Sequence, residues 1–183
     1  MNTTTLADKL GQPTHDSALL QKAHRVGLAD AGALERLAVA RGCWHYRQPD
    51  MTGFPEVIES EFTNEELAIA LLSPSLPYSP HTIRLGAAML GATGNRPDQL
   101  AQLAKAESCE LGVRYIAKAG RRFEPDNVFW QELLDRVPES GGLEDGVFPH
   151  PTRFVSMTGF TRNGPGLVTV WIRPRADLVF AHG

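Results

Sequence analysis

The residues of this chain best able to bind a metal ion are two cysteines and a few histidines. Cys43 and His45 are one residue apart, and His81 or Cys109 could complete a set of ligands. A zinc ion in a protein usually has four ligands that come in recognisable pairs. Because the sequence has one loose pair and no second one, we expect a buried thiol near a half-buried histidine and predict neither a metal site nor a cofactor.

Nucleophilic catalysis by Cys109 is a second chemistry to consider. We expect this cysteine at the start of a helix, where the helix dipole would favour a thiolate. The sequence places no general base beside it and has no Gly-x-Ser-x-Gly motif. His150, between two prolines, has no identifiable partner. We assign no catalytic residue and favour a protein without enzymatic activity, and we leave open whether any of these side chains is functional: Cys43, His45, His81, Cys109 and His150.

A small glycine loop, residues 91–96, precedes a predicted helix. Helix N-termini bind anions, so such a loop could hold a phosphate. The loop lacks the Lys-Ser/Thr of a P-loop, and no strand clearly precedes it. We interpret it as an ordinary turn between helices.

Four basic residues lie at helical spacing in a predicted helix and just after it: Arg114, Lys118, Arg121 and Arg122. Their offsets of four, seven and eight residues place them on one face, which could bind a phosphate or an acidic partner. The alternative is the solvated flank of a helix packed on the core. The net charge of the whole chain is −3, which gives no general attraction to nucleic acid or to an anionic membrane. We expect neither partner.

Arginine and aromatic side chains are also interleaved near the C-terminus, at Arg153, Phe160, Arg162, Trp171 and Arg173. These residue types are enriched at binding hot spots and also stack on unpaired bases. The alternative is that the aromatic residues face the helices while the arginines solubilise a strand edge. Together with the basic helix face, these five residues are our candidate binding residues.

The elements that position these residues are predicted to be mostly helical. A capping box begins a helix at Thr63, and Ser79 followed by Pro80 begins another. Five short helices are expected over residues 62–137, the fourth of them ending at Gly120. A loop over residues 48–55 separates an N-terminal helical arm, residues 1–50, from a body, residues 51–183, within what we expect to be one compact domain.

The last part of the chain has the composition of β-structure. Residues 153–160 and 167–173 are rich in Val, Thr, Phe and Trp, and they flank Arg162-Asn163-Gly164-Pro165-Gly166, a strong hairpin signal. We predict a mainly α fold, a stack or bundle of about five to seven short helices with a C-terminal antiparallel hairpin over residues 152–174. The alternative is an α+β fold with a small three-stranded sheet, in which residues 57–58 or 178–180 add the third strand.

Residues 79–120 read as a helical hairpin, with an Arg and small residues in the first helix and a glycine at its end. This segment resembles a HEAT-type repeat. The resemblance implies a superhelical stack of helices used for binding partners.

With no enzymatic motif retained, we expect a non-catalytic interaction or adaptor protein that binds another protein or itself, with a homodimer formed through the hairpin edge. The alternative is a small enzyme or ligand-binding protein with a pocket between helices and hairpin that uses His, Cys and Arg side chains. The N-terminus resembles no secretory signal, and two separated cysteines favour a reducing compartment. We therefore expect a cytoplasmic protein.

Overall fold

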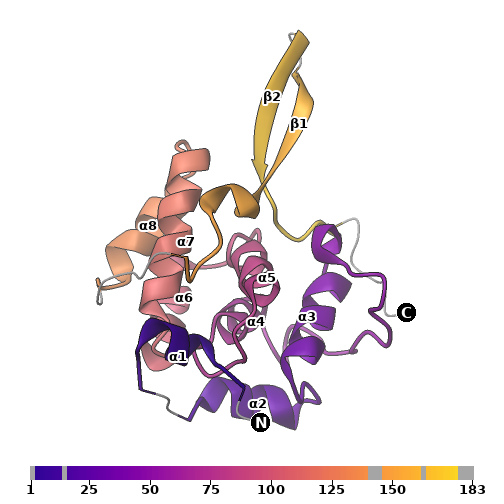
Figure 1. Cartoon of the computed structure of the whole chain (residues 1–183), viewed down its shortest axis with the longest axis vertical. Coiled ribbons are helices and arrows are strands. Elements are labelled where there is room, and N and C mark those ends of the chain that lie inside the picture. The colour runs from indigo at the N-terminus through magenta and orange to yellow at the C-terminus, as the bar shows by residue number, and fades with distance from the viewer. Residues whose placement is uncertain (1–2, 14–15, 140–145, 162–163, 177–183) are drawn as a thin grey trace.

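The computed structural model describes residues 3–13, 16–139, 146–161 and 164–176, without the side chains of residues 157–168. In this part of the chain, eight α-helices precede a two-stranded antiparallel hairpin (Figure 1), which confirms the predicted mainly helical class. The helices are α1 (Leu6–Leu10), α2 (Ala18–Arg25), α3 (Ala31–Ala40), α4 (Asn64–Leu71), α5 (Pro80–Leu90), α6 (Pro97–Ala106), α7 (Glu110–Phe123) and α8 (Val128–Arg136), with 3-10 turns η1 (Trp44–Tyr46) and η2 (Pro151–Phe154).

Both helix starts predicted from capping residues are confirmed. The Thr63 hydroxyl accepts a hydrogen bond from Glu66 N at 3.0 Å, and Thr63 N donates to Glu66 Oε1 at 3.0 Å. The Ser79 hydroxyl accepts from Thr82 N at 3.3 Å, and Pro80 occupies the first helical position. These local bonds satisfy backbone N–H groups that have no partner inside the helix.

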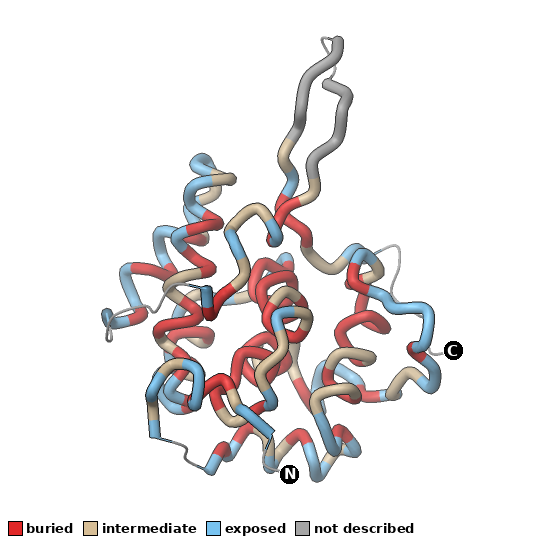
Figure 2. The backbone as a smooth tube through the Cα atoms, in the orientation of Figure 1, coloured by how far each residue is buried: buried red, intermediate tan, exposed pale blue. Residues whose placement is uncertain are grey.

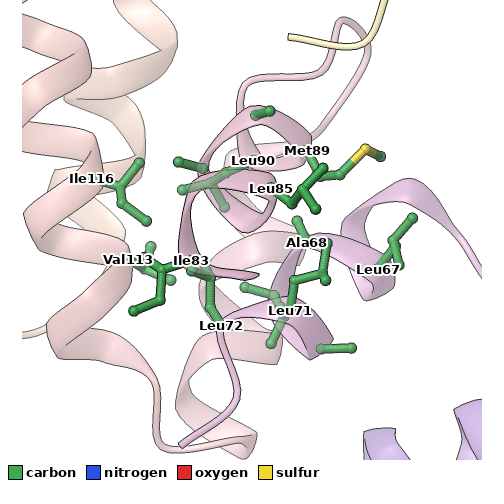
Figure 3. Close-up of a cluster of buried hydrophobic side chains, with 14 of the residues drawn as sticks. Leu67, Ala68, Leu71, Leu72, Ile83, Leu85, Met89, Leu90, Val113 and Ile116 are labelled. Carbon is green, nitrogen blue, oxygen red and sulfur yellow. The ribbon is translucent and has the colours of Figure 1, made fainter. Parts of the chain in front are cut away.

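Helices α4 and α5 form the centre of the molecule, with α3 on one side and α6 to α8 on the other (Figure 1). They approach closely at Gly86, where an added Cβ would lie 2.7 Å from Leu72 Cδ2. Most of α5 is buried (Figure 2). Its Ile83 and Leu90 point into a cluster with Val113 and Ile116 of α7 (Figure 3). Short helices such as these are stable because their apolar faces pack together.

The N-terminal segment packs against the same core. Leu6, Leu19 and Leu34, from α1, α2 and α3, all belong to the central hydrophobic cluster. The buried Glu107 carboxylate accepts hydrogen bonds from the Ser17 hydroxyl and from Leu19 N, at the start of α2. Residues 1–50 are therefore tied to the body by both apolar and polar contacts.

The predicted end of the fourth helix at Gly120 is wrong, because α7 continues to Phe123. The Trp130 indole of α8 lies against this glycine, and a Cβ there would be 2.2 Å from Trp130 Cδ2. Gly120 thus allows two helices to approach closely and does not terminate one. The basic face predicted on this helix is consequently continuous as far as Arg122.

The hairpin consists of β1 (Val155–Thr161) and β2 (Gly164–Trp171), and it projects from the helical body (Figure 1). Val155 pairs with Trp171 at the base and Thr161 with Gly164 near the turn, with an irregularity between Thr158 and Phe160. Strand β2 therefore includes glycines that the sequence had assigned to the loop.

No third strand joins the hairpin within the described residues. Val57 and Ile58 form no strand, and residues 178–180, the other candidate, lie outside the description. No helix in the described chain is long and apolar enough to cross a lipid bilayer.

Candidate functional site at the base of the hairpin

An aromatic cluster fixes the base of the hairpin to the helices. Trp171, the last residue of β2, is 1% exposed, and its ring centre lies 4.7 Å from that of Trp130 and 5.7 Å from that of Phe154. Its indole N–H points to Ala87 O at 3.4 Å. A Cβ on Gly91 would lie 2.6 Å from Trp171 Nε1, so only glycine leaves room for this indole.

An ion pair next to this cluster ties the chain after β2 to the turn between α7 and α8. Arg173 Nη2 and Nη1 donate to the two oxygens of Glu124 at 2.6 and 3.1 Å, and Arg173 Nε donates to Gly91 O at 2.9 Å. Trp130 Nε1 donates to the same carboxylate at 2.9 Å. Partial burial alone would raise the pKa of Glu124, but these hydrogen bonds outweigh it and lower the pKa. The carboxylate is therefore held in its charged form.

The chain is also fastened on its opposite side, to the turn after α3. Arg175 N donates to Gly42 O, in this turn, at 3.1 Å. Nearer to β2, Ile172 N donates to the carbonyl of Phe154, the last residue of η2, at 3.0 Å. Gly42 has a φ of +118°, and a Cβ there would lie 2.4 Å from Arg175 O. Both the backbone conformation and the close contact require glycine at this position. The projecting hairpin thus rises from a base held on two sides.

A cleft of about 570 Å³ lies between the hairpin base and the α3–η1 turn. Its volume is within the range of ligand-binding pockets. Val170, 47% exposed, is one of the large hydrophobic residues on the described surface. Among the described residues, the cleft is lined by Gly42, Trp44, His45, Ser156, Val170, Trp171, Ile172, Arg173 and Arg175. The large apolar side chains in this lining suit an apolar segment of a partner.

The structure separates the candidate binding residues of the hairpin into different environments. The Trp171 indole belongs to the core, and Arg173 is bound to Glu124, yet both also line the cleft. Arg153 is exposed, and its carbonyl accepts a hydrogen bond from the Tyr46 hydroxyl at 2.9 Å. The side chains of Phe160 and Arg162 lie outside the described residues, so their predicted role stays a prediction.

The basic face of α7 is divided in the same way. Arg114 Nη1 donates to Leu134 O at 2.9 Å and to Val137 O at 2.6 Å, which satisfies carbonyls at the end of α8. Lys118, Arg121 and Arg122 are exposed. Arg121 donates to Gln131 Oε1 at 3.0 Å, and Arg122 lies over the Phe123 ring. Arg114 therefore stabilises the end of α8, and the other three residues form a solvated basic surface.

The cysteines and histidines are not assembled into one reactive centre. Cys43 and Cys109 are buried free thiols, and burial raises the pKa of each, against the thiolate considered for Cys109. Burial also lowers the pKa of His81, whose Nε2 is buried without a hydrogen-bond partner among the described residues. His150 is exposed and its Nδ1 contacts the Thr152 hydroxyl. Within the described chain, no group of three or more His, Cys, Asp or Glu side chains could hold a metal ion.

The glycine loop over residues 91–96 caps one helix and starts the next. The Asn95 amide donates to Met89 O and Leu90 O, at 2.8 and 3.1 Å, at the end of α5. Arg96 N, at the start of α6, donates to the Glu65 carboxylate at 2.7 Å. A protein carboxylate thus occupies the position that a phosphate would take.

Sequence reasoning missed Gly42 and Trp44, which the α3–η1 turn contributes to the cleft, and considered His45 only as a possible metal ligand or reactive side chain. Their proximity to β2 depends on the path of the chain after the hairpin, which local patterns do not encode. Comparisons with protein-family models, with curated proteins and with solved structures find no match for this chain.

Proposed function

We propose that this protein is a non-catalytic interaction module whose recognition element is the β-hairpin with the cleft at its base. The observation that carries the proposal is a two-stranded hairpin that projects from a helical body while its base is fixed by Trp171 and Arg173 (Figure 1). Isolated two-stranded hairpins are barely stable in water, so the anchored base supports an otherwise weak element. A partner that pairs with it would add further stability.

Each strand has one neighbour within the described residues, which leaves an outer edge of backbone N–H and C=O groups on either side. An extended segment of a partner can pair with such an edge and place alternate side chains in an adjacent pocket. The cleft beside Val170 and Ile172 supplies that pocket. Because Val170, Trp171 and Ile172 line the cleft, we expect a partner segment that places apolar side chains in it.

The partner is another protein or a second copy of this chain, paired through the hairpin edge. A cytoplasmic location and the use of the helical stack in the manner of a HEAT-type repeat belong to the same proposal. The two buried free cysteines fit a reducing compartment.

The experiment compares Val170→Lys with Val128→Lys. Val170 lies on β2 at the cleft, and Val128 is a still more exposed valine on α8, at 69%. We expect wild-type protein and Val128→Lys to retain the same partner in a native pull-down, or to self-associate equally in sedimentation velocity, and Val170→Lys to lose that association. Equal behaviour of all three proteins, each with unchanged far-UV circular dichroism, would contradict the proposal.

A further inference from the structure

A buried arginine lies in a second pocket, on the face formed by α3 and the loop before α4. Arg41 follows α3 directly and is 9% exposed. It lines a pocket of about 330 Å³ together with apolar residues and two polar ones: Leu37, Ala40, Pro55, Val57, Ile58, Glu59 and Asn64. A buried cation is costly unless an anion accompanies it, so the partners of this guanidinium decide what the pocket can bind.

The described residues give Arg41 only neutral acceptors. Nη1 donates to Asn64 Oδ1 at 3.0 Å, and Nη2 donates to Val57 O at 2.9 Å. No carboxylate forms an ion pair with Arg41 in the described chain. A guanidinium has five N–H donors, so these two hydrogen bonds leave further donors for a ligand.

Two carboxylates are near enough to act on Arg41 through space, but both are held by other groups. Glu59 Oε1 accepts from Asn64 Nδ2 at 2.6 Å. Glu66 accepts from Lys22 Nζ at 2.5 Å and from Thr63 N at 3.0 Å. Burial lowers the pKa of Arg41, and the two carboxylates offset this only in part. Neither carboxylate is in direct contact with the Arg41 guanidinium among the described residues.

Apart from Glu59 and Asn64, the rest of the pocket is apolar, and Ile58 and Glu59 are its exposed residues. Leu37 and Val57 are buried beside Arg41, whereas Ile58 is 56% exposed, one of the large hydrophobic residues that the described surface presents. An exposed isoleucine next to a pocket is a favourable contact for an alkyl chain. The pocket thus combines the Arg41 cation with a largely apolar wall that also carries the Glu59 carboxylate.

We propose that this pocket binds a small amphipathic monocarboxylate, with its carboxylate on Arg41 and its alkyl chain against Val57 and Ile58. Arginine pairs with carboxylates through two parallel hydrogen bonds, which are stronger than bonds to neutral acceptors. The Glu59 carboxylate on the pocket wall opposes an anion and limits the affinity. This pocket and the hairpin cleft share no lining residue, although Arg41 and Gly42 are adjacent in the chain, and the proposal does not depend on the function proposed above.

The test is isothermal titration calorimetry with sodium octanoate, octylammonium chloride and 1-octanol, which share a chain length and differ in charge. We expect wild-type protein to bind octanoate about tenfold or more tightly than the other two ligands. Equal affinity for octanoate and 1-octanol would overturn the proposal, since the carboxylate would then contribute nothing.

Three exposed positions locate the binding without disturbing the core. Glu59→Gln removes the opposing charge and should tighten octanoate binding several-fold, whereas Ile58→Ser removes the apolar contact and should weaken it several-fold. Val128→Ser, a change at another exposed valine, should have no effect. If Glu59→Gln and Ile58→Ser both leave octanoate affinity unchanged, binding occurs elsewhere and the proposal is wrong.

Discussion

Replacing Trp171 with alanine tests whether this residue belongs to the core or to a binding surface. The indole is 1% exposed and packs on Trp130, Phe154 and the Gly91 backbone. Truncating a buried tryptophan to alanine costs about 3–5 kcal/mol of unfolding free energy, through lost burial and the cavity left behind. In a chain of this length such a loss lowers the melting temperature by roughly 6–20 °C.

The matched control for this change is the preceding residue of the same strand. Val170 is 47% exposed, so Val170→Ala should alter the unfolding free energy by only about 0.5 kcal/mol. Urea unfolding followed by far-UV circular dichroism measures both variants without relying on tryptophan fluorescence. A loss below about 1 kcal/mol for Trp171→Ala would show that the indole is not packed as described. It would then be available for the hot-spot role that its residue type suggested.

Three further predictions concern the same anchor and the buried thiols. Gly120→Ala should lower the unfolding free energy by about 1–3 kcal/mol in urea, because its Cβ would overlap Trp130. Gly32→Ala in α3 should be neutral or stabilising, because a Cβ there would meet only the ends of the Arg36 and Asp30 side chains, at 3.2 and 3.4 Å. The pKa of Glu124 is lowered in the folded protein, so its stabilising effect is complete above the unfolded pKa of about 4.3 and is lost as pH falls through the lower folded pKa. The difference in unfolding free energy between wild type and Glu124→Gln should therefore be constant near neutral pH and shrink in acid. A difference that does not change with pH would contradict the ion pair. The thiols of Cys43 and Cys109 are buried, so neither should react with Ellman's reagent in native protein at about pH 8, and both should react in about 6 M guanidinium. Rapid labelling of either thiol in the native protein would be evidence against its burial.

The anchor of the hairpin uses residue types that are also common at binding interfaces. Trp171 and Arg173 carry out their packing and pairing within the chain, and each still forms part of the cleft wall. A partner bound in the cleft would therefore contact residues already fixed in place. Preorganised contacts of this kind lower the entropic cost of binding.

Much of the helical architecture could be predicted because its signals are local. The Thr63 capping box and the Ser79-Pro80 start depend on residues within four positions of each other, and both are present. The hairpin was predicted for the same reason, since Asn-Gly between β-rich segments is a short-range pattern. The extension of α7 beyond Gly120 was not predicted, because that glycine serves a contact with Trp130 on another helix.

The sequence alone determined that the chain is mainly helical, where two of the helices begin, and that a hairpin lies near the C-terminus. Each of these properties follows from hydrogen bonds and hydrophobic spacing within a few residues. Only the tertiary structure decided that Trp171 and Arg173 anchor the hairpin and that Gly42 and His45 meet it at a cleft. It also decided that Arg41 is buried with no carboxylate paired to it among the described residues. These facts depend on contacts between residues far apart in the chain, where the identity of a neighbour is set by packing and not by sequence distance.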